Sequence, residues 1–499
     1  MSSTELYTAY KTKMQKIADV KYASAVLQWD QEIYLPPKGN DGRGRQIATL
    51  NEIAHQQFTD LKTGSLLLEL NAREDLLPHE KRNVQLSLED YNRNKKLSSD
   101  FVRHMSEAVN KSYHAWTKAV TENSFAIFQQ PLHELIQLKK QEAYMLGYEQ
   151  HPYNALMNDY DKGLTVSTAD NIFNDLKPQL LLLLETIKNK PPVDNSFLHQ
   201  YFKKEDQWKF GLEILKGMGF DFEAGRQDIS LHPFTTNFSS MDVRITTRID
   251  EHDFGNMTWS CIHEGGHALY EQGLPAEQYG LPLGEYCSLS IHESQSRIWE
   301  NCIGRGLPFW QHNFNELNSF FQKQLNNLTT EQFYKGINKV APSLIRTESD
   351  ELTYHFHVMI RYELEKMLIE GNIETKDIPA FWNEHYQKYL GITVPDDKKG
   401  CLQDIHWSHG SFGYFATYSL GSMYAAQLYA AIEREIPSIE REIAEGNNGG
   451  IQKWLKDNIY QYGRHFSSEE LCKKATGESL QSKYFILYAT RKYTQIYSE

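Results

Sequence analysis

Apolar residues recur at helical spacing along most of the chain. Segments such as Tyr7–Trp29, Leu135–Leu146 and Phe314–Leu328 place apolar side chains three and four positions apart and contain few Gly or Pro. The whole chain has only 16 prolines, so few helices are expected to be interrupted. This pattern predicts a mainly α-helical fold.

Four short stretches rich in Gly, Pro, Asn or Asp interrupt the helical pattern and are predicted to be loops. They lie at residues 36–40, 190–196, 391–400 and 446–450. None is long enough, or biased enough in composition, to link separate domains, and no internal repeat with a fixed period is evident. The sequence therefore favours one continuous helical body.

One region departs from the helical pattern. In residues 228–236 and 242–249, β-branched residues alternate with polar ones, which is typical of a small, half-exposed sheet. We therefore predict a strand pair there. An extended peptide can add main-chain hydrogen bonds to a strand, and Asp242–Thr247 is our candidate for this role. In the alternative interpretation, Asp242 and Arg244 only brace the sheet.

Composition and charge exclude several classes of protein. The 499 residues are 40% hydrophobic and 23% charged, with a net charge of −13 and no long basic block, so nucleic acid and anionic membrane surfaces are not expected partners. The longest aliphatic run, Leu180–Leu184, is far too short to span a membrane. The N-terminal residues lack the pattern of a signal peptide, and the five cysteines form no CxxC pair. We expect a cytoplasmic protein with reduced thiols.

The segment His263-Glu264-Gly265-Gly266-His267 is an H-E-x-x-H motif. On a helix it places both imidazoles one turn apart on one face, where they can share a metal ion, with Glu264 beside it. The paired glycines cost about 1 kcal/mol each relative to Ala, which makes sense if a ligand or another backbone approaches closely. The alternative interpretation is a pair of core histidines.

A catalytic zinc needs three protein ligands and one open position. The metzincin continuation is absent, because Tyr270 and Gly273 occupy the positions of its Gly and His. A second helix is predicted at residues 286–301 and can return a carboxylate to the metal. Spacing leaves four candidates for the third ligand: Glu285, His292, Glu293 and Glu300. Arg297, one turn after Glu293, can orient that carboxylate.

This set of residues has a defined chemistry. Zn²⁺ lowers the pKa of a bound water to about 7 and polarises a peptide carbonyl. A neighbouring carboxylate takes the proton of the water and passes it to the leaving amine, and Glu264 is the candidate for this role.

At these motifs the chain resembles the metallocarboxypeptidases of peptidase family M32, the carboxypeptidase Taq group. His263–His267 looks like the zinc motif of that family, and His292-Glu293-Ser-Gln-Ser-Arg297 looks like its third-ligand motif, which selects Glu293. Four further segments fit its other motifs: His232-Pro-Phe234, Asp242-Val-Arg244-Ile-Thr246, Ile345-Arg346-Thr-Glu-Ser349-Asp350 and Gly400-Cys-Leu-Gln403-Asp404-Ile-His406-Trp407. Ser349 stands where Ala is usual. The resemblance extends from Gln28-Trp29-Asp30 to Gly463, which is essentially the whole chain.

The resemblance implies a fold, an activity and an assembly. The expected fold is one large helical peptidase domain over residues 1–499 with a deep cleft and a small sheet beside the zinc helix, similar to angiotensin-converting enzyme and neurolysin. Its expected parts are N-terminal helices at about 1–200, the zinc site and substrate motifs at about 225–430, and C-terminal helices at about 431–499. The implied activity removes single residues from peptide C-termini with broad specificity, using Zn²⁺ or Co²⁺, usually in a homodimer.

Two alternatives to this activity stay open. One is a dipeptide-releasing or endo-acting peptidase of similar helical fold. The other is a peptide-binding protein without hydrolysis, against which the intact Glu264 argues.

The family motifs also suggest roles for the other residues. Arg346 is expected to hold the terminal carboxylate of the substrate, although a salt bridge to Asp350 is an alternative. Among three nearby tyrosines, Tyr418 is favoured over Tyr414 and Tyr424 as the oxyanion donor. His406 either faces the substrate or holds Asp404. By resemblance, substrate binding also includes His232, Asp242 and Arg244, whereas His355 and His357 are expected to be structural.

Overall fold

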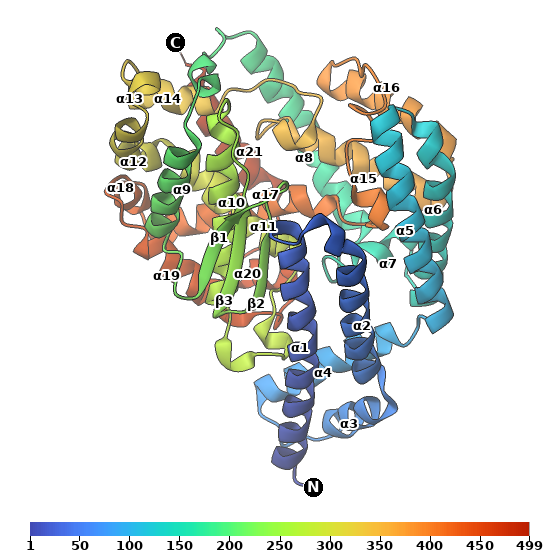
Figure 1. Cartoon of the computed structure of the whole chain (residues 1–499). Helices are drawn as coiled ribbons and strands as arrows, with labels where there is room; N and C mark the ends of the chain where they lie inside the picture. Colours follow the sequence, from blue (N-terminus) through green and yellow to red (C-terminus); the bar gives the residue numbers. More distant parts are fainter. Residues whose placement is uncertain (499) are drawn as a thin grey trace. The chain divides into compact units, whose positions relative to one another are not determined.

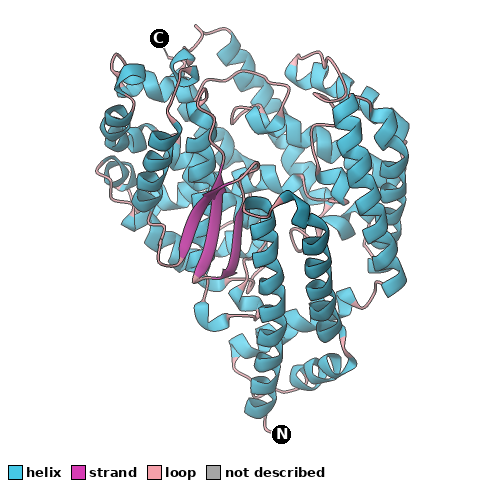
Figure 2. Cartoon of the chain, in the orientation of Figure 1, coloured by secondary structure: helices cyan, strands magenta, loops and turns pink. Residues whose placement is uncertain are grey.

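The computed structural model describes residues 1–498 and is mainly helical, with one small sheet (Figures 1 and 2). The predicted fold class is therefore confirmed. Its α-helices are α1 (Ser3–Ile33), α2 (Asn40–Thr59), α3 (Leu61–Asn71), α4 (Pro78–Asn94), α5 (Ser99–Glu122), α6 (Phe125–Leu146), α7 (Pro152–Met157), α8 (Val166–Lys188), α9 (Lys204–Met218), α10 (Phe254–Gly273), α11 (Leu289–Arg297), α12 (Leu307–Phe320), α13 (Gln322–Leu325), α14 (Thr330–Ile337), α15 (Tyr354–Glu370), α16 (Ile378–Leu390), α17 (Ala416–Glu435), α18 (Ile439–Ala444), α19 (Gly449–Asn458), α20 (Ser468–Thr476) and α21 (Ser482–Ile496).

Local signals explain where the helices near the metal motif begin. The carboxylate of Asp253 accepts a hydrogen bond from the Gly255 amide (2.9 Å) at the start of α10, and the Ser288 hydroxyl caps α11 in the same way. Two sequence predictions need correction. The predicted helix Phe314–Leu328 is broken at Phe321, and Gly449-Gly450 begins α19 rather than continuing a loop.

The chain divides into two compact units, each built from separate stretches of sequence. Unit 1 comprises Met1–Lys95, Asp194–Ile337 and Ala425–Ser479, and unit 2 comprises Lys96–Val193, Asn338–Tyr424 and Leu480–Glu499. The sequence predicted one peptidase domain whose parts end near residues 200 and 430. This division stays a prediction. No helix of the described part of the chain is long and apolar enough to cross a membrane.

The sheet of unit 1 has three strands rather than the predicted pair. They are β1 (Gly225–Ile229), β2 (Thr235–Ser239) and β3 (Asp242–Thr247). The order is β1-β3-β2, with β3 parallel to β1 and antiparallel to β2. The predicted strand at 228–236 is therefore wrong, because the chain leaves the sheet between Ile229 and Thr235.

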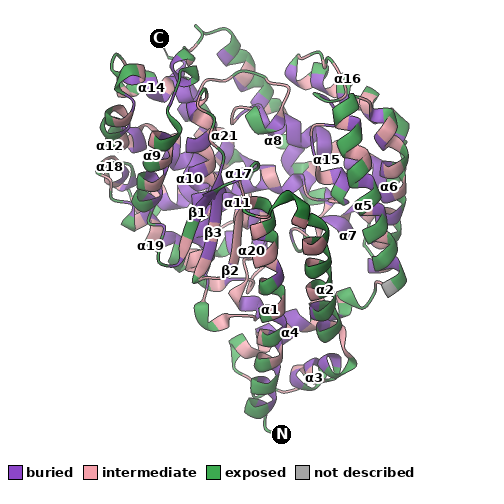
Figure 3. Ribbon diagram, viewed as in Figure 1, coloured by how far each residue is buried: buried purple, intermediate pink, exposed green. Residues whose placement is uncertain are grey.

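The central position of β3 also corrects its predicted role. Because β3 has a neighbour on each side, its main chain cannot accept an extended peptide. Helix α10 packs against β3 and β2, and also against α9 and α11. Most of α10 is buried, whereas α2 is exposed along most of its length (Figure 3).

Unit 2 contains a helix with an unusually polar interior. Every residue of α15 from Tyr354 to Tyr362 is buried, and its neighbours include α6, α7 and α16. Four of its fully buried side chains can carry a charge: His355, His357, Arg361 and Glu365. Such groups need specific partners, because burying an uncompensated charge is costly.

Candidate active site

Three side chains of unit 1 form a metal-binding arrangement. His263 and His267 lie one turn apart on α10, and Glu293 lies on α11. The Oε2 atom of Glu293 is 3.6 Å from Nε2 of His263 and 3.5 Å from Nε2 of His267, and the three ligand atoms all lie within 4.8 Å of one another. Ligands at about 2.1 Å from a tetrahedral ion are about 3.4 Å apart. The residues therefore fit one divalent ion.

The other ring nitrogens of both histidines have partners that orient them. Nδ1 of His263 lies 2.8 Å from Oε2 of Glu300, and Nδ1 of His267 lies 3.0 Å from the carbonyl oxygen of His292. These contacts leave the two Nε2 atoms directed toward Oε2 of Glu293, where they could hold an ion. Glu300 and His292 were candidate ligands in the sequence, and the structure places both in this supporting role.

Glu293 is held in a similar way. The Arg297 guanidinium donates to Oε1 of Glu293 (2.7 Å) and leaves Oε2 directed at the histidines. Arg297 also donates to Glu300 (3.1 Å), which lies in the π-helix η5 (Ile298–Gly304) directly after α11. The expected contact between Arg297 and Glu293 is therefore present.

Electrostatics favour a cation at this point. Burial opposes ionisation of Glu293, but Arg297, His263 and His267 outweigh it and hold the pKa of Glu293 well below its usual range. Burial lowers the pKa of His267 to about 3, so its imidazole is neutral and its Nε2 lone pair is available. An ionised carboxylate beside a neutral imidazole is the donor set that zinc sites use.

Gly266 allows α11 to approach α10 closely. A Cβ atom on Gly266 would lie 2.7 Å from the carbonyl oxygen of Gln295 and 2.7 Å from Cα of Ser296, both in the backbone of α11. At Gly265, a Cβ would instead meet the flexible ends of Leu215 and Met218. The expectation that another backbone approaches the paired glycines is therefore confirmed for Gly266 alone.

Glu264 lies between the two histidines in sequence and is buried. Its Oε2 atom accepts a hydrogen bond from the Thr235 hydroxyl (2.6 Å) at the start of β2. Burial raises the pKa of Glu264, while His263 and Thr235 lower it by less. A carboxylate with a raised pKa is a better proton acceptor. Sequence reasoning missed Thr235, although it directly follows the His232-Pro-Phe234 motif.

Asp242 and Arg244 form a bidentate pair on β3. Nε and Nη2 of Arg244 donate to the two carboxylate oxygens of Asp242, at 2.9 Å each. The guanidinium also lies 4.3 Å from the ring of Trp29 on α1 and 4.8 Å from that of Phe238 on β2. These contacts match the bracing interpretation. His232 is exposed between β1 and β2, and its substrate role stays a prediction.

A cavity of about 560 Å³ lies in unit 1 between α1, α2 and β2. Trp29 of α1, Gly44 of α2 and the segment Phe234–Thr236 line it. Because Thr235 contacts both this cavity and Glu264, the cavity adjoins the candidate base.

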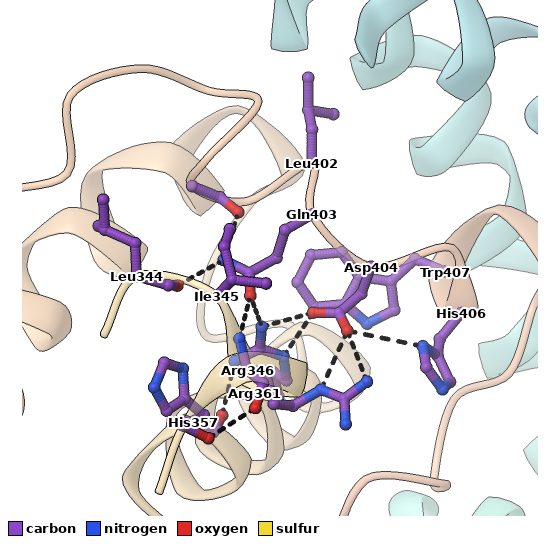
Figure 4. A network of polar contacts seen from close by, with 12 residues as sticks. Leu344, Ile345, Arg346, His357, Arg361, Leu402, Gln403, Asp404, His406 and Trp407 are labelled. Carbon is purple, nitrogen blue, oxygen red and sulfur yellow. Dashed lines mark hydrogen bonds and ion pairs between the residues drawn. The ribbon is translucent and has the colours of Figure 1, made fainter. Parts of the chain in front are cut away.

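In unit 2, Arg346 belongs to a buried polar network, shown in Figure 4. Its Nε and Nη2 atoms donate to Oδ1 of Asp404, at 3.1 and 3.0 Å. Arg361 donates from Nε to Oδ2 of the same carboxylate (2.6 Å) and from Nη2 to Gln403 (2.8 Å). Two guanidinium groups therefore share one carboxylate, so this group of three side chains keeps one excess positive charge.

The network excludes one of the two interpretations of Arg346, and its role in binding the substrate stays a prediction. Its ion pair is with Asp404, so the salt bridge to Asp350 is wrong. Asp350 instead accepts hydrogen bonds from the amides of Leu352 and Thr353 just before α15. Sequence reasoning did not identify Arg361. One signal in the sequence could have identified Arg361: it is a charged residue among the apolar residues of a predicted helix.

His406 and Tyr418 contact each other in unit 2. Nε2 of His406 is 3.2 Å from the Tyr418 hydroxyl, and its Nδ1 atom is 3.8 Å from Oδ1 of Asp404. Burial lowers the pKa of His406 to about 3, so the ring is neutral. The guanidinium carbon of Arg346 lies 4.9 Å from the Tyr418 ring. Arg346, His406 and Tyr418 therefore form one cluster.

His355 and His357, which are predicted to be structural, both lie in the interior of unit 2. His355 contacts Ser419 (3.0 Å) and His357 contacts the Tyr386 hydroxyl (2.8 Å), and both are fully buried. The metal residues and Glu264 thus lie together in unit 1, and the Arg346 cluster lies in unit 2.

Comparison with known proteins identifies relatives along nearly the whole chain. A family model described as "Carboxypeptidase Taq (M32) metallopeptidase" matches residues 9–493. The chain is 36% identical to Carboxypeptidase 1 of Bacillus subtilis over 488 residues, which cover 97% of each chain. It is also 36% identical to Thermostable carboxypeptidase 1 of Thermus thermophilus over 506 residues, which cover 98% of this chain and 99% of the other.

Solved structures with the same fold include one described as "Crystal structure of M32 carboxypeptidase from Deinococcus radiodurans R1". It has a TM-score of 0.97 and 36% identity over 99% of each chain. Another, described as "The Structure of CHT", has a TM-score of 0.96 and 55% identity, and covers 98% of this chain and 99% of the other.

Proposed function

The chain belongs to the carboxypeptidase Taq (M32) metallopeptidase family, and we propose that it removes single residues from the free C-termini of peptides with broad specificity. The observation that carries this proposal is the position of Glu293, whose Oε2 atom lies 3.6 and 3.5 Å from the Nε2 atoms of His263 and His267. Glu264 lies beside this arrangement on α10.

We propose one divalent ion per chain, held by His263, His267 and Glu293. Two imidazoles and one carboxylate suit Zn²⁺ best, and Co²⁺ accepts the same ligands. When bound, the ion would polarise the scissile carbonyl and make a water molecule more acidic. Inductively coupled plasma analysis of purified protein, followed by chelation and reloading, identifies the ion and tests whether activity depends on it.

Glu264 is the proposed general base and acid. Its raised pKa suits it to take a proton from the attacking water and to return it to the leaving amine. The Thr235 hydroxyl donates to its Oε2 atom (2.6 Å) and leaves Oε1 for the water. Thr235 thereby limits rotation of the carboxylate.

The Arg346 cluster is proposed to bind the substrate and its transition state. Arg346 would pair with the terminal carboxylate, for which the excess positive charge of the network is suited. The Tyr418 hydroxyl would donate to the developing oxyanion, with neutral His406 as its hydrogen-bonding partner.

The edge of β2 is a better candidate than β3 for main-chain pairing with the substrate. Phe234 accepts a hydrogen bond from the Thr246 amide (2.9 Å), so the alternation of an antiparallel ladder directs the main-chain groups of Thr235 and Asn237 away from β3. An extended peptide placed there would lie next to the cavity and to Glu264.

A digest of a defined peptide tests the mode of cleavage. Mass spectrometry should show a ladder that shortens by one residue at a time, and C-terminal amidation should block it. Release of dipeptides, or internal cleavage of the amidated peptide, would instead support the alternative of a dipeptidyl-carboxypeptidase or oligopeptidase.

Substitution of Glu264 tests the mechanism. Glu264→Gln keeps the size of the side chain and removes its basicity, so we expect metal content to be retained and turnover to fall by at least about a hundredfold. Metal-replete variant with near wild-type activity would overturn the role of Glu264.

Assembly and location are proposed from the family resemblance and from the charge of the chain. We propose a cytoplasmic homodimer that binds peptides and no nucleic acid. Light scattering on a size-exclusion column tests the dimer, because a mass near 58.0 kDa would mean a monomer.

A further inference from the structure

A fully buried carboxylate, Glu365 on α15, contacts two ends of one loop in unit 2. Its Oε1 atom accepts a hydrogen bond from the indole Nε1 of Trp407 (2.7 Å). Its Oε2 atom accepts one from the amide of Gly413 (2.8 Å) and one from the hydroxyl of Tyr153 on α7 (2.5 Å). Glu365 is 0% exposed, so these three donors replace water as its partners.

The loop between these two contacts is short and tightly constrained. The Gly410 amide donates to the carbonyl of Trp407 (3.0 Å) and the Ser411 amide to that of His406 (3.0 Å). Gly413 has a φ of +95°, and a Cβ there would lie 2.7 Å from the backbone of Leu156 in α7. The loop therefore packs directly against α7, and Glu365 anchors both of its ends.

The candidate catalytic groups of unit 2 lie at the edges of this loop. His406 immediately precedes Trp407, and Tyr418 lies in the first turn of α17, just after the loop. The ring of Tyr414 connects them, at 5.3 Å from the ring of His406 and 5.0 Å from that of Tyr418. The 3.2 Å contact between His406 and Tyr418 thus depends on the path of the loop.

The burial of Glu365 is costly and is not offset by an ion pair. Its three hydrogen-bond donors, the Trp407 indole, the Gly413 amide and the Tyr153 hydroxyl, are all neutral. Burial raises its pKa to about 7, although its three donors and the charge of Lys139 oppose this shift. An apolar residue would avoid this cost. The presence of a carboxylate here is explained if its three hydrogen bonds specify the position of the loop.

We propose that Glu365 is a positioning residue for peptide hydrolysis, because its carboxylate holds Trp407 and Gly413 and thereby keeps His406 in contact with Tyr418. Glu365 acts through the loop and does not touch the substrate. This inference rests on the proposed function, in which His406 and Tyr418 stabilise the transition state.

Glu365→Gln tests the proposal, because an amide cannot accept from all three donors. Its NH₂ group must face either the Trp407 indole N–H or the two donors at Oε2, so one anchor of the loop is lost. We expect kcat per metal-loaded site to fall by at least about tenfold, with KM changed by less than about twofold. The matched control is Glu363→Gln on the same helix, since Glu363 contacts Lys177 and Tyr389 instead. The control should keep wild-type kcat.

A second variant covers the case in which Glu365→Gln does not fold. Trp407→Phe removes the indole N–H, together with part of the volume of a buried ring, and it should lower kcat in the same way. In a double-mutant cycle the two losses should be much less than multiplicative, because both variants release the same loop. Multiplicative losses, or wild-type kcat in both folded single variants, would overturn the proposal.

Failure of this inference can be told apart from failure of the proposed function. If the wild-type protein trims peptides and Glu264→Gln does not, while Glu365→Gln has wild-type kcat, only the role of Glu365 is wrong. If the wild-type protein does not trim peptides, or if Glu264→Gln does, the proposed function itself is wrong.

Discussion

Replacement of Gly266 by Ala should weaken metal binding without changing any ligand. The added Cβ would lie 2.7 Å from two backbone atoms of α11, whereas ordinary van der Waals contact begins at about 3.4 Å. The difference, 3.4 − 2.7, means that α11 must move by about 0.7 Å. Because Glu293 belongs to α11, its Oε2 atom would move relative to the two histidines. Metal–ligand distances tolerate only about 0.2 Å.

The expected magnitudes follow from this displacement. Ala gains about 1 kcal/mol over Gly in helix propensity, and overpacking of a tight interface costs about 1–3 kcal/mol. We therefore expect a net loss of about 0–2 kcal/mol in the free energy of unfolding. Metal affinity should fall by about 10- to 100-fold, as it does when the support of a metal ligand is disturbed.

Gly265→Ala is the matched control. Its Cβ would meet Cδ2 of Leu215 at 2.8 Å and Cε of Met218 at 2.9 Å, and both are ends of flexible side chains. Competition with a chromogenic chelator measures metal affinity, and thermal unfolding of the metal-free proteins measures stability. Wild-type affinity in Gly266→Ala, or equal losses in both variants, would refute the reasoning.

Three further predictions concern other parts of the site. Glu300→Ala should weaken metal binding about 10- to 100-fold, because the Nδ1 atom of His263 loses its 2.8 Å partner. Chelator competition measures the affinity, and an unchanged affinity would contradict the prediction. Arg346→Ala should raise KM for peptides with a free C-terminal carboxylate and reduce discrimination against C-terminal amides, as measured in parallel peptide digests. An equal loss of activity toward both substrates would exclude binding of the carboxylate by Arg346. The pKa of Glu365 is raised in the folded state, so the unfolded state ionises first as the pH rises. Relative to Glu365→Gln, the wild type should therefore lose about 3 kcal/mol of its free energy of unfolding between about pH 4.5 and about pH 7. The same pH dependence of the free energy of unfolding in both proteins would contradict this.

The helices and the metal motif could be predicted because their signals are local. The spacing of apolar residues gives the period of α10, and that period alone places His263 and His267 on one face. The errors arose where tertiary contacts override local pattern. The alternation at 228–236 looks like one strand, yet the chain turns away from the sheet after Ile229. No local signal in the sequence indicates that β3 is the central strand.

The partners of the charged side chains could not be predicted from spacing. Arg346 has an acidic residue one turn on, yet its partner is Asp404, 58 positions away. Likewise, Thr235 reaches Glu264 across 29 positions. Each pair depends on how helices and strands pack. The family resemblance selected Glu293 where spacing had left four candidates, since a motif carries long-range information that periodicity does not.

The sequence by itself determined the helical fold class, the pair of histidines on one helix and, through its motifs, the family. Only the tertiary structure decided which atoms point at one another: that Gly266 lets α11 reach α10, that Glu300 orients His263, and that Glu365 anchors the loop beside His406. The physical reason is the range of the forces involved. Helix periodicity follows from the backbone within a few residues, whereas close packing and buried hydrogen bonds join residues that are adjacent only after folding.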